Sequence, residues 1–271
     1  GEAPLVAFLE ERIKNHPVDL VVPIGGAGVQ FAARHRDRLF PVTPILAVAA
    51  EPRMVPPGFL EKNATLVTQR IDLPGMIEDI LQMQPDTSHI AVVFGSSQLE
   101  KIWLEECRRE FREFEGRVKF IWMTDLTLEQ LVQKCSKLPP RSFILHELFI
   151  VDAVGVPSER NEALRRLHES SNAPIFAPFS SELGMGAIGG RLFQNSEIGV
   201  QGGRMAVRIL RGENASQLPP LIVETATPTF DWRELRRWKI PEANLPPGSV
   251  IKFRQPGFWE RYRWLVIGAG I

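Results

Sequence analysis

The chain has 271 residues, of which 44% are hydrophobic and 24% are charged, a composition typical of a globular protein with one large domain or two lobes. Lys and Arg together number 32, as do Asp and Glu, so the net charge is zero and no basic surface indicates a nucleic-acid partner. The first residues lack the basic and apolar regions of a secretory signal peptide.

Alternating helices and strands follow one another along the chain. Apolar residues at helical spacing predict helices over residues 5–15, 29–39, 73–83, 97–114, 128–138, 158–171 and 199–210. Apolar runs without alternation predict buried strands over residues 19–24, 44–50, 89–94, 118–123, 142–147 and 174–178. Residues 53–72 are rich in turn formers and contain no predicted strand. Such strands, separated by helices, indicate parallel sheets covered on both faces.

The last third of the chain is less regular. A glycine-rich stretch over residues 184–190 precedes the helix at 199–210, and the alternating run at 221–227 predicts a strand. A short helix ending near Trp238, a proline-rich loop and an isolated strand over residues 249–253 complete the pattern. Trp103 and Trp122 lie in apolar patterns and are expected in the core.

Cys107 and Cys135 are the only cysteines, too few for a disulfide scaffold or a zinc site of the usual spacing. Each falls in a predicted helix. In a doubly wound sheet of the flavodoxin-like strand order, the first two crossover helices lie on opposite faces. We therefore expect the two thiols to be unpaired.

The final segment has the order expected where a membrane helix begins. An uncharged run starts at Leu265, and directly before it stand several aromatic residues together with Arg261 and Arg263. Only seven apolar residues follow Trp264, whereas a spanning helix needs about 20. We expect this segment to be the start of a membrane anchor; the alternative is a C-terminal helix or strand that packs on its own domain.

Several segments carry a resemblance to a known family: residues 19–25, 36–41, 186–190, 203–212 and 230–238. Together they resemble the periplasmic-binding-protein-like ABC-transporter substrate-binding proteins of type I fold. The resemblance is greatest to the version that serves as the extracytoplasmic sensor region of bacterial membrane histidine kinases. Residues 259–264 resemble the junction with the membrane helix in such kinases.

The resemblance implies an α/β fold with two doubly wound parallel-sheet lobes and an interlobe cleft. The family's initial strand-helix-strand unit is absent, so the first lobe is expected to be truncated. We expect residues 1–72 and 185–214 to form the N-terminal lobe and residues 73–184 and 215–230 the C-terminal lobe. Residues 231–271 are expected to form a membrane-proximal tail that leads into a transmembrane helix.

Strand ends supply the candidate ligand site, because open parallel sheets bind ligands at the carboxyl ends of their strands. The candidate ligand-binding residues are Gly25, Gly26, Ala27, Glu51, Gly95, Ser96, Ser97, Asp125, Glu147, Phe179 and Ser180. The best candidates are Gly95, Ser96 and Ser97, because small residues and free N–H groups at a helix start accept a carboxylate or another anion. Simple helix capping by Ser96 or Ser97 is an equal alternative.

Two further motifs favour binding or structural roles over catalysis. Residues 26–31 begin a dinucleotide fingerprint, but Phe31 stands where a third glycine would allow close packing, so a glycine-rich ligand loop or a plain turn is favoured. His146 and Glu147 are neighbours on a strand and therefore point to opposite faces, which favours a hydrogen-bonded histidine over an acid–base pair. We expect no catalytic residue, no metal and no cofactor.

These features together predict the extracytoplasmic ligand-sensing domain of a membrane histidine kinase, on the periplasmic face of a bacterial inner membrane. A small solute of unknown class would close the cleft by rotation at crossings near residues 72–74 and 184–186, and the tail would pass closure to the membrane helix. A homodimer is implied for the full-length protein by the resemblance. The alternative is the substrate-binding subunit of an ABC transporter, and a third possibility is a nucleotide-dependent enzyme that uses residues 26–31.

Overall fold

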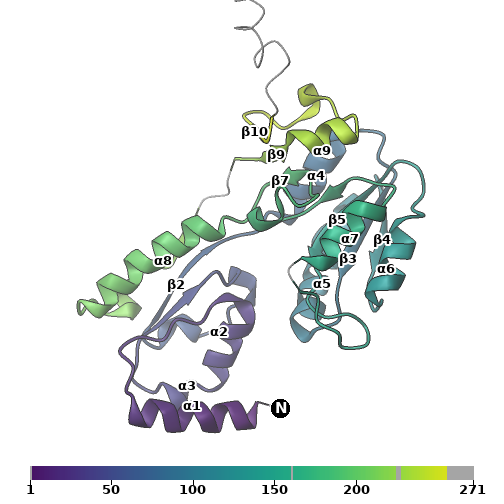
Figure 1. Ribbon diagram of the computed structural model, residues 1–271. Helices are drawn as coiled ribbons and strands as arrows, with labels where there is room; N and C mark the ends of the chain where they lie inside the picture. Colours follow the sequence, from purple (N-terminus) through teal and green to yellow (C-terminus); the bar gives the residue numbers. More distant parts are fainter. Residues whose placement is uncertain (1, 160, 224–226, 255–271) are drawn as a thin grey trace, which may run out of the picture.

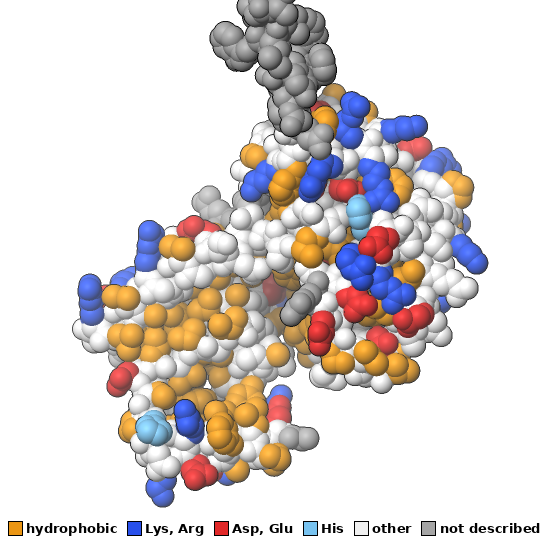
Figure 2. Space-filling model, in the orientation of Figure 1, with side chains coloured by type: hydrophobic (Ala, Val, Ile, Leu, Met, Phe, Trp, Pro, Cys, Tyr) orange, Lys and Arg blue, Asp and Glu red, His pale blue; other side chains and the backbone are white. Residues whose placement is uncertain are grey.

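The computed structural model describes residues 2–159, 161–223 and 227–254. These residues form two α/β lobes joined by extended crossings, with the N-terminal helices at the far end of the first lobe (Figure 1). Figure 2 shows hydrophobic side chains gathered on the first lobe, whereas acidic and basic side chains are prominent on the second. The α/β class and the two-lobed parallel-sheet architecture predicted from the sequence are confirmed.

The first lobe is built on a parallel sheet in the order β1-β2-β8. Its strands are β1 (Ile45–Val48), β2 (Ala64–Gln69) and β8 (Leu221–Val223). Three helices, α1 (Ala3–Asn15), α2 (Gly25–Arg34) and α3 (Arg36–Leu39), pack on one face, where Ile45 and Ala47 point. The longer α8 (Asn195–Leu210) packs on the other face, against Leu46 and Val48. Alternate residues of one short strand therefore supply two separate cores.

The second lobe contains a larger parallel sheet in the order β4-β3-β5-β6. Its elements are α4 (Leu73–Met83), β3 (His89–Phe94), α5 (Gln98–Glu110), β4 (Lys119–Met123), α6 (Leu128–Cys135), β5 (Ser142–Leu148), α7 (Glu162–Ser170) and β6 (Ile175–Phe176). Helices α4 and α5 cover one face, and α6 and α7 cover the other. Cys107 and Cys135 accordingly lie in different cores, on opposite faces, as the crossover argument predicts.

A small third sheet lies at the far end of the second lobe, in the order β10-β9-β7. It consists of β7 (Gly189–Gly190), β9 (Thr229–Asp231) and β10 (Val250–Lys252), with α9 (Trp232–Arg237) following β9 directly. Short 3-10 helices complete the described chain: η1 (Pro52–Met54), η2 (Phe59–Glu61), η3 (Phe111–Phe114), η4 (Ser180–Glu182), η5 (Ala215–Gln217) and η6 (Glu242–Asn244).

The structure differs from the sequence prediction in several places. The helix predicted over residues 29–39 is two helices, α2 and α3. The turn-rich stretch at 53–72 contains β2, a fully buried strand at the centre of the first sheet. The segment at 19–24 is not a buried strand: only Val21 and Ile24 bridge to β1, and Ile24 is 72% exposed. The strand at 249–253 is not isolated, because β10 pairs with β9.

Two strands also lie in lobes other than those expected. β8 falls within the segment expected in the C-terminal lobe, yet it pairs with β2 of the first-lobe sheet. β7 falls within the segment expected in the N-terminal lobe, yet it pairs with β9 of the second lobe. The chain therefore crosses between lobes after β2, between β7 and α8, and between β8 and β9.

One side chain links the first two crossings. Gln69 is 1% exposed; its amide nitrogen donates to the carbonyl of Leu192 at 3.3 Å, and its amide oxygen accepts from the backbone N–H of Gln194 at 2.9 Å. Nearby, the guanidinium of Arg191 binds both carboxylate oxygens of Asp79, at 2.9 and 3.2 Å, and one oxygen of Asp72 at 3.2 Å. The crossing expected near 184–186 is instead part of the second lobe, where Gly186 packs against His168 of α7.

We expect Gln69→Ala to lower the free energy of unfolding by about 1–3 kcal/mol, because it leaves the partly buried N–H of Gln194 without its partner and removes one of the two amide donors to the carbonyl of Leu192. Urea unfolding of the protein measures the change. Gln133→Ala, which removes the exposed amide of α6, is the matched control and should change stability by less than about 0.5 kcal/mol. Equal effects of the two variants would contradict the link between the crossings.

Candidate functional site

A cavity of about 330 Å³ lies between the lobes, and we call it the interlobe chamber. The first lobe contributes Ile24, the start of α2 and the residues that follow β1. The second lobe contributes α5, the end of β5 and the residues that follow β6. Its walls are formed by Ile24, Gly25, Gly26, Ala49, Glu51, Met54, Ile71, Leu99, Trp103, Leu148, Phe179, Ser181, Phe193 and Asn195. Most of these side chains are apolar, as is usual for small-molecule sites.

Arg53 of η1 contacts both lobes behind the chamber walls formed by Glu51 and Trp103. Its guanidinium binds Glu51 at 2.9 Å and the carbonyl of Ile71 at 2.6 Å, and reaches across to Glu110 of α5 at 3.1 Å. The same group lies over the ring of Trp103, 5.2 Å from its centroid, within the range of a cation–π interaction. The negative charge of Glu51 at the chamber wall is therefore already paired.

Trp103 links the chamber to a buried carboxyl group. The side chain is 3% exposed, and its indole N–H donates to a carboxylate oxygen of Glu147 at 3.2 Å. Burial raises the pKa of Glu147 to about 7, an effect that the hydrogen bond from Trp103 opposes and the nearby Glu182 carboxylate reinforces. Glu147 therefore titrates near neutral pH.

A second cavity of about 200 Å³, the second-lobe recess, lies beside the chamber and shares Leu148, Phe179 and Ser181 with it. His146 and Glu147 both line this recess. The Nδ1 atom of His146 lies 2.9 Å from a carboxylate oxygen of Glu182. Within the described chain, His146 Nε2 and the second carboxylate oxygen of Glu147 are buried without a hydrogen-bond partner. The expectation of a fully hydrogen-bonded histidine is thus only half met.

The structure brings together some of the candidate residues and leaves others apart. Gly25, Gly26, Glu51 and Phe179 line the interlobe chamber, and Glu147 lines the recess. The candidates that line neither cavity are Ala27, Gly95, Ser96, Ser97, Asp125 and Ser180. Asp125 is exposed and adopts a positive φ of 52°, which identifies it as a turn residue.

Gly95, Ser96 and Ser97 do not offer the anion site expected of them, because the chain's own Glu100 occupies it. Glu100 is fully buried, and its carboxylate accepts from the backbone N–H groups of Gly95 at 3.1 Å, Ser97 at 2.8 Å and Ile150 at 2.6 Å. The Ser97 hydroxyl accepts from Glu100 N in return, so the two residues form a capping box. Capping, the alternative interpretation, is what the structure shows.

The glycines at the start of α2 allow close packing. Gly26 faces Met54, whose Cβ would lie 3.0 Å from a Cβ at position 26, and Gly28 faces Pro23 at 3.6 Å. Both lie within the helix itself, so the motif is neither a loop between strand and helix nor a plain turn. Gly25 and Gly26 nevertheless place uncapped helix N–H groups at the chamber, since no side chain of the described residues caps α2.

Sequence reasoning missed the residues that make the chamber apolar. Trp103 was expected in the core; it is buried, but it also lines the chamber one helical turn after Leu99. Phe193 and Asn195 lie at the crossing into α8, where no periodic signal marks them. A signal existed only for α5, because Leu99 and Trp103 are four residues apart and therefore share one face of the helix.

Comparison with known proteins supports a binding role. The sequence pattern of the family described as ABC transporter substrate binding protein matches residues 2–230. The chain belongs to this family. The predicted periplasmic-binding-protein-like fold is thereby confirmed, and the described family consists of binding proteins rather than enzymes.

Solved structures share the fold at low sequence identity. The ABC domain from Streptococcus pneumonia, in complex with L-Trp, is 18% identical, with a TM-score of 0.67 over 91% of this chain and 83% of that chain. A conserved domain protein from Vibrio cholerae is 19% identical, with a TM-score of 0.69 over 92% and 84%. A ligand-free, open substrate binding protein with adhesive properties from Clostridium difficile is 16% identical, with a TM-score of 0.64 over 93% and 84%. No curated protein matches the sequence.

These matches favour the transporter-type binding protein, the alternative interpretation, over the histidine-kinase sensor region. The aromatic and apolar ending expected to start a membrane anchor lies outside the described residues. Among the helices of the described residues, none combines the length and apolarity needed to cross a bilayer. Membrane attachment and dimer formation stay predictions.

We expect Glu147 to make stability depend on pH between about 4.5 and 7. Its pKa is higher in the folded than in the unfolded state, so the folded state binds the proton more tightly, and its stabilising effect is complete below pH 4.5 and lost as pH rises through 7. Glu147→Gln cannot ionise and should gain stability relative to the parent over this interval, by about 1.4 kcal/mol per unit of pKa difference. Urea unfolding at several pH values measures this, with Glu105→Gln on the exposed face of α5 as control. A constant difference between Glu147→Gln and the parent would contradict the raised pKa.

Proposed function

We propose that this protein is the substrate-binding component of an ABC-type system and binds a small solute with an apolar body and an anionic end in the interlobe chamber. The observation that carries the proposal is the position of the chamber, whose walls come from both lobes. A ligand that contacts both lobes at once binds the closed arrangement more tightly than the open one, and therefore shifts the protein toward closure.

We infer that the ligand has an apolar body from the residues that form the chamber walls. Trp103, Phe179 and Phe193 provide aromatic surface, and Leu99, Leu148 and Ile71 provide aliphatic surface. A volume of about 330 Å³ is at the lower end of the range for small-molecule sites, which suits a solute of metabolite size. Aromatic walls favour a planar ligand, because stacked or edge-to-face rings gain energy beyond that of burial alone.

We infer that the ligand has an anionic end from the groups at the start of α2. Gly25 and Gly26 lie at the chamber, and the uncapped N–H groups of this helix suit a carboxylate. Asn195 and Ser181 add neutral hydrogen-bonding groups on the same walls. The related structure from Streptococcus pneumonia holds L-Trp, a solute that combines an aromatic ring with a carboxylate. That likeness supports an aromatic amino acid or aromatic carboxylate as the first ligand to test.

A substrate-binding role places the protein outside the cytoplasm, where such components meet their solutes. Signal output through a membrane kinase is not needed to explain any contact of the described residues. The closing rotation is absorbed by the crossings after β2 and between β7 and α8, which connect the lobes by short extended segments.

We expect L-Trp to bind with one site per chain and to raise Tm in a concentration-dependent way, as linkage requires for a ligand of the folded state. Trp103→Leu should weaken binding at least about tenfold, equivalent to about 1.4 kcal/mol, because it removes the largest aromatic wall. Calorimetric titration measures both.

Trp122→Leu is the matched control. Trp122 lies in β4, stacked on Phe111 and tilted against Phe120, and does not line the chamber. Its substitution should leave affinity within about twofold of the parent. Equal loss in the two variants, or no binding of L-Trp, L-Phe, indole-3-acetate or L-Leu by the folded protein, would contradict the proposal.

A further inference from the structure

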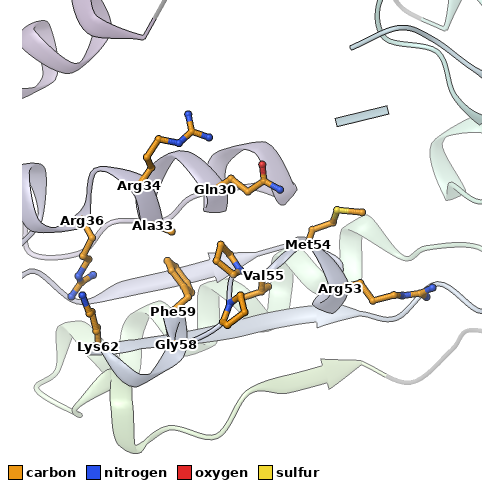
Figure 3. Close-up of a pocket in the computed structure, with 12 residues that line it drawn as sticks. Gln30, Ala33, Arg34, Arg36, Arg53, Met54, Val55, Gly58, Phe59 and Lys62 are labelled. Atoms are coloured by element: carbon orange, nitrogen blue, oxygen red, sulfur yellow. The ribbon is translucent and has the colours of Figure 1, made fainter. Parts of the chain in front are cut away.

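A second large cavity lies wholly within the first lobe, and we call it the first-lobe groove. It has a volume of about 550 Å³ and runs between α2 and the segment from η1 to η2 (Figure 3). Met54 separates it from the interlobe chamber, since this side chain lines both cavities. Neither the family match nor the proposed solute site accounts for this groove.

The groove contains a buried arginine without a partner for one of its nitrogens. Arg36 is 5% exposed, and within the described chain its Nη1 is buried and makes no hydrogen bond. Burial lowers the pKa of Arg36, and the adjacent Asp37 opposes this effect from a side chain that is 87% exposed. Since arginine does not lose its charge in proteins, the guanidinium stays cationic and requires an anion.

A second cation faces Arg36. In Figure 3 the ends of the Arg36 and Lys62 side chains point toward one another at one end of the groove. The Lys62 ammonium is only loosely paired, with a carboxylate oxygen of Asp37 at 3.6 Å, and both side chains are largely exposed. Two like charges directed at the same space repel one another unless an anion lies between them.

The other two arginines that line the groove have partners elsewhere. Arg34 binds Glu2 at 2.6 Å and points away from the groove in Figure 3. Arg53 also points away, toward its contacts with Glu51 and Glu110. Arg36 and Lys62 are therefore the cationic groups available to a ligand in the groove.

The remaining walls of the groove are apolar. Phe59, Val55, Pro56 and Pro57 come from the segment between η1 and η2, and Ala33 comes from α2. Gln30 supplies the single neutral amide among the lining residues. Apolar surface next to a cationic end suits a ligand with an apolar body, because burying that body removes apolar area from water.

We propose that the first-lobe groove binds a small carboxylate with an apolar body, held by Arg36 and Lys62. The planar guanidinium of Arg36 accommodates a carboxylate by two parallel hydrogen bonds, and Lys62 adds a second charge-assisted bond. The apolar part of the ligand lies along Phe59 and the two prolines.

Calorimetric titration with benzoate tests the proposal. We perform it on the parent and on Trp103→Leu protein, in which binding at the interlobe chamber is weakened at least about tenfold, so that an affinity shared by both proteins belongs to the groove. Benzoate should bind one site saturably, and more tightly than acetate, which lacks the apolar body. Benzyl alcohol, which lacks the charge, should not bind. Equal binding of benzoate and benzyl alcohol would overturn the role of the cations.

Variants of the two cations locate the site. Arg36→Met and Lys62→Met should each weaken benzoate binding at least tenfold. Arg38→Met is the matched control, because Arg38 lies on the same short helix but binds Glu10 at 2.6 Å and is 58% exposed. Its substitution should leave benzoate affinity unchanged. Unchanged affinity in Arg36→Met and Lys62→Met would overturn the proposal.

Thermal unfolding gives an independent readout. Lys62→Glu supplies a carboxylate opposite Arg36 from the chain itself, so it should raise Tm by about 2–4 °C without ligand and abolish benzoate binding. Lys62 is 64% exposed, so the variant is expected to fold. A lowered Tm together with retained benzoate binding would overturn the assignment.

Discussion

The contact of Arg53 with both lobes is the interaction that joins them beside the interlobe chamber. One guanidinium binds a carboxylate of the first lobe, a carbonyl of the crossing and a carboxylate of the second lobe, and covers the ring of Trp103. The side chain is 13% exposed, so these bonds are weakened little by water. Because the two carboxylates come from different lobes, their distance from each other depends on the angle between the lobes. The same group therefore contacts two wall residues of the chamber, Glu51 and Trp103, and bonds across the two lobes.

Much of the fold was predictable because the second lobe has strong local signals. β3 matches its predicted range from residue 89 to residue 94, and its apolar residues are buried on both faces. β2 was missed because its buried positions include Thr65, Thr68 and Gln69. Thr68 bonds to the carbonyl of its neighbour Gln69. Thr65 and Gln69, however, bond to backbone groups that are distant in sequence, at Leu218 for Thr65 and at Leu192 and Gln194 for Gln69. Such partners come together only in the folded chain, so a local sequence pattern cannot predict these hydrogen bonds.

The candidate site was predictable to a smaller extent. The rule that ligands bind at strand ends led to Glu51 and Phe179, and the structure places both at the wall of the interlobe chamber. The same rule predicted an anion site at Gly95 and Ser97 that the structure does not have. The sequence already contained the signal for a capping box there, a glutamate three residues after a serine. The burial of Glu100 was not visible, since it requires the loop after β5 to donate the N–H of Ile150. Phe193 and Asn195 depend on where the second crossing passes, which is a tertiary property.

The hydrogen bonds of Gln69 have a mechanical consequence. Its amide joins the backbone of one crossing to the backbone of the other at two points, so a torsional change in one crossing strains the other unless both change together. The first two of the three crossings are thus coupled, whereas the third, between β8 and β9, is separate. Coupling two crossings through a buried amide limits sliding and twisting of the lobes and favours bending about an axis through that amide. Fewer relative motions are then lost when the lobes close, so closure costs less entropy than it would between freely jointed lobes.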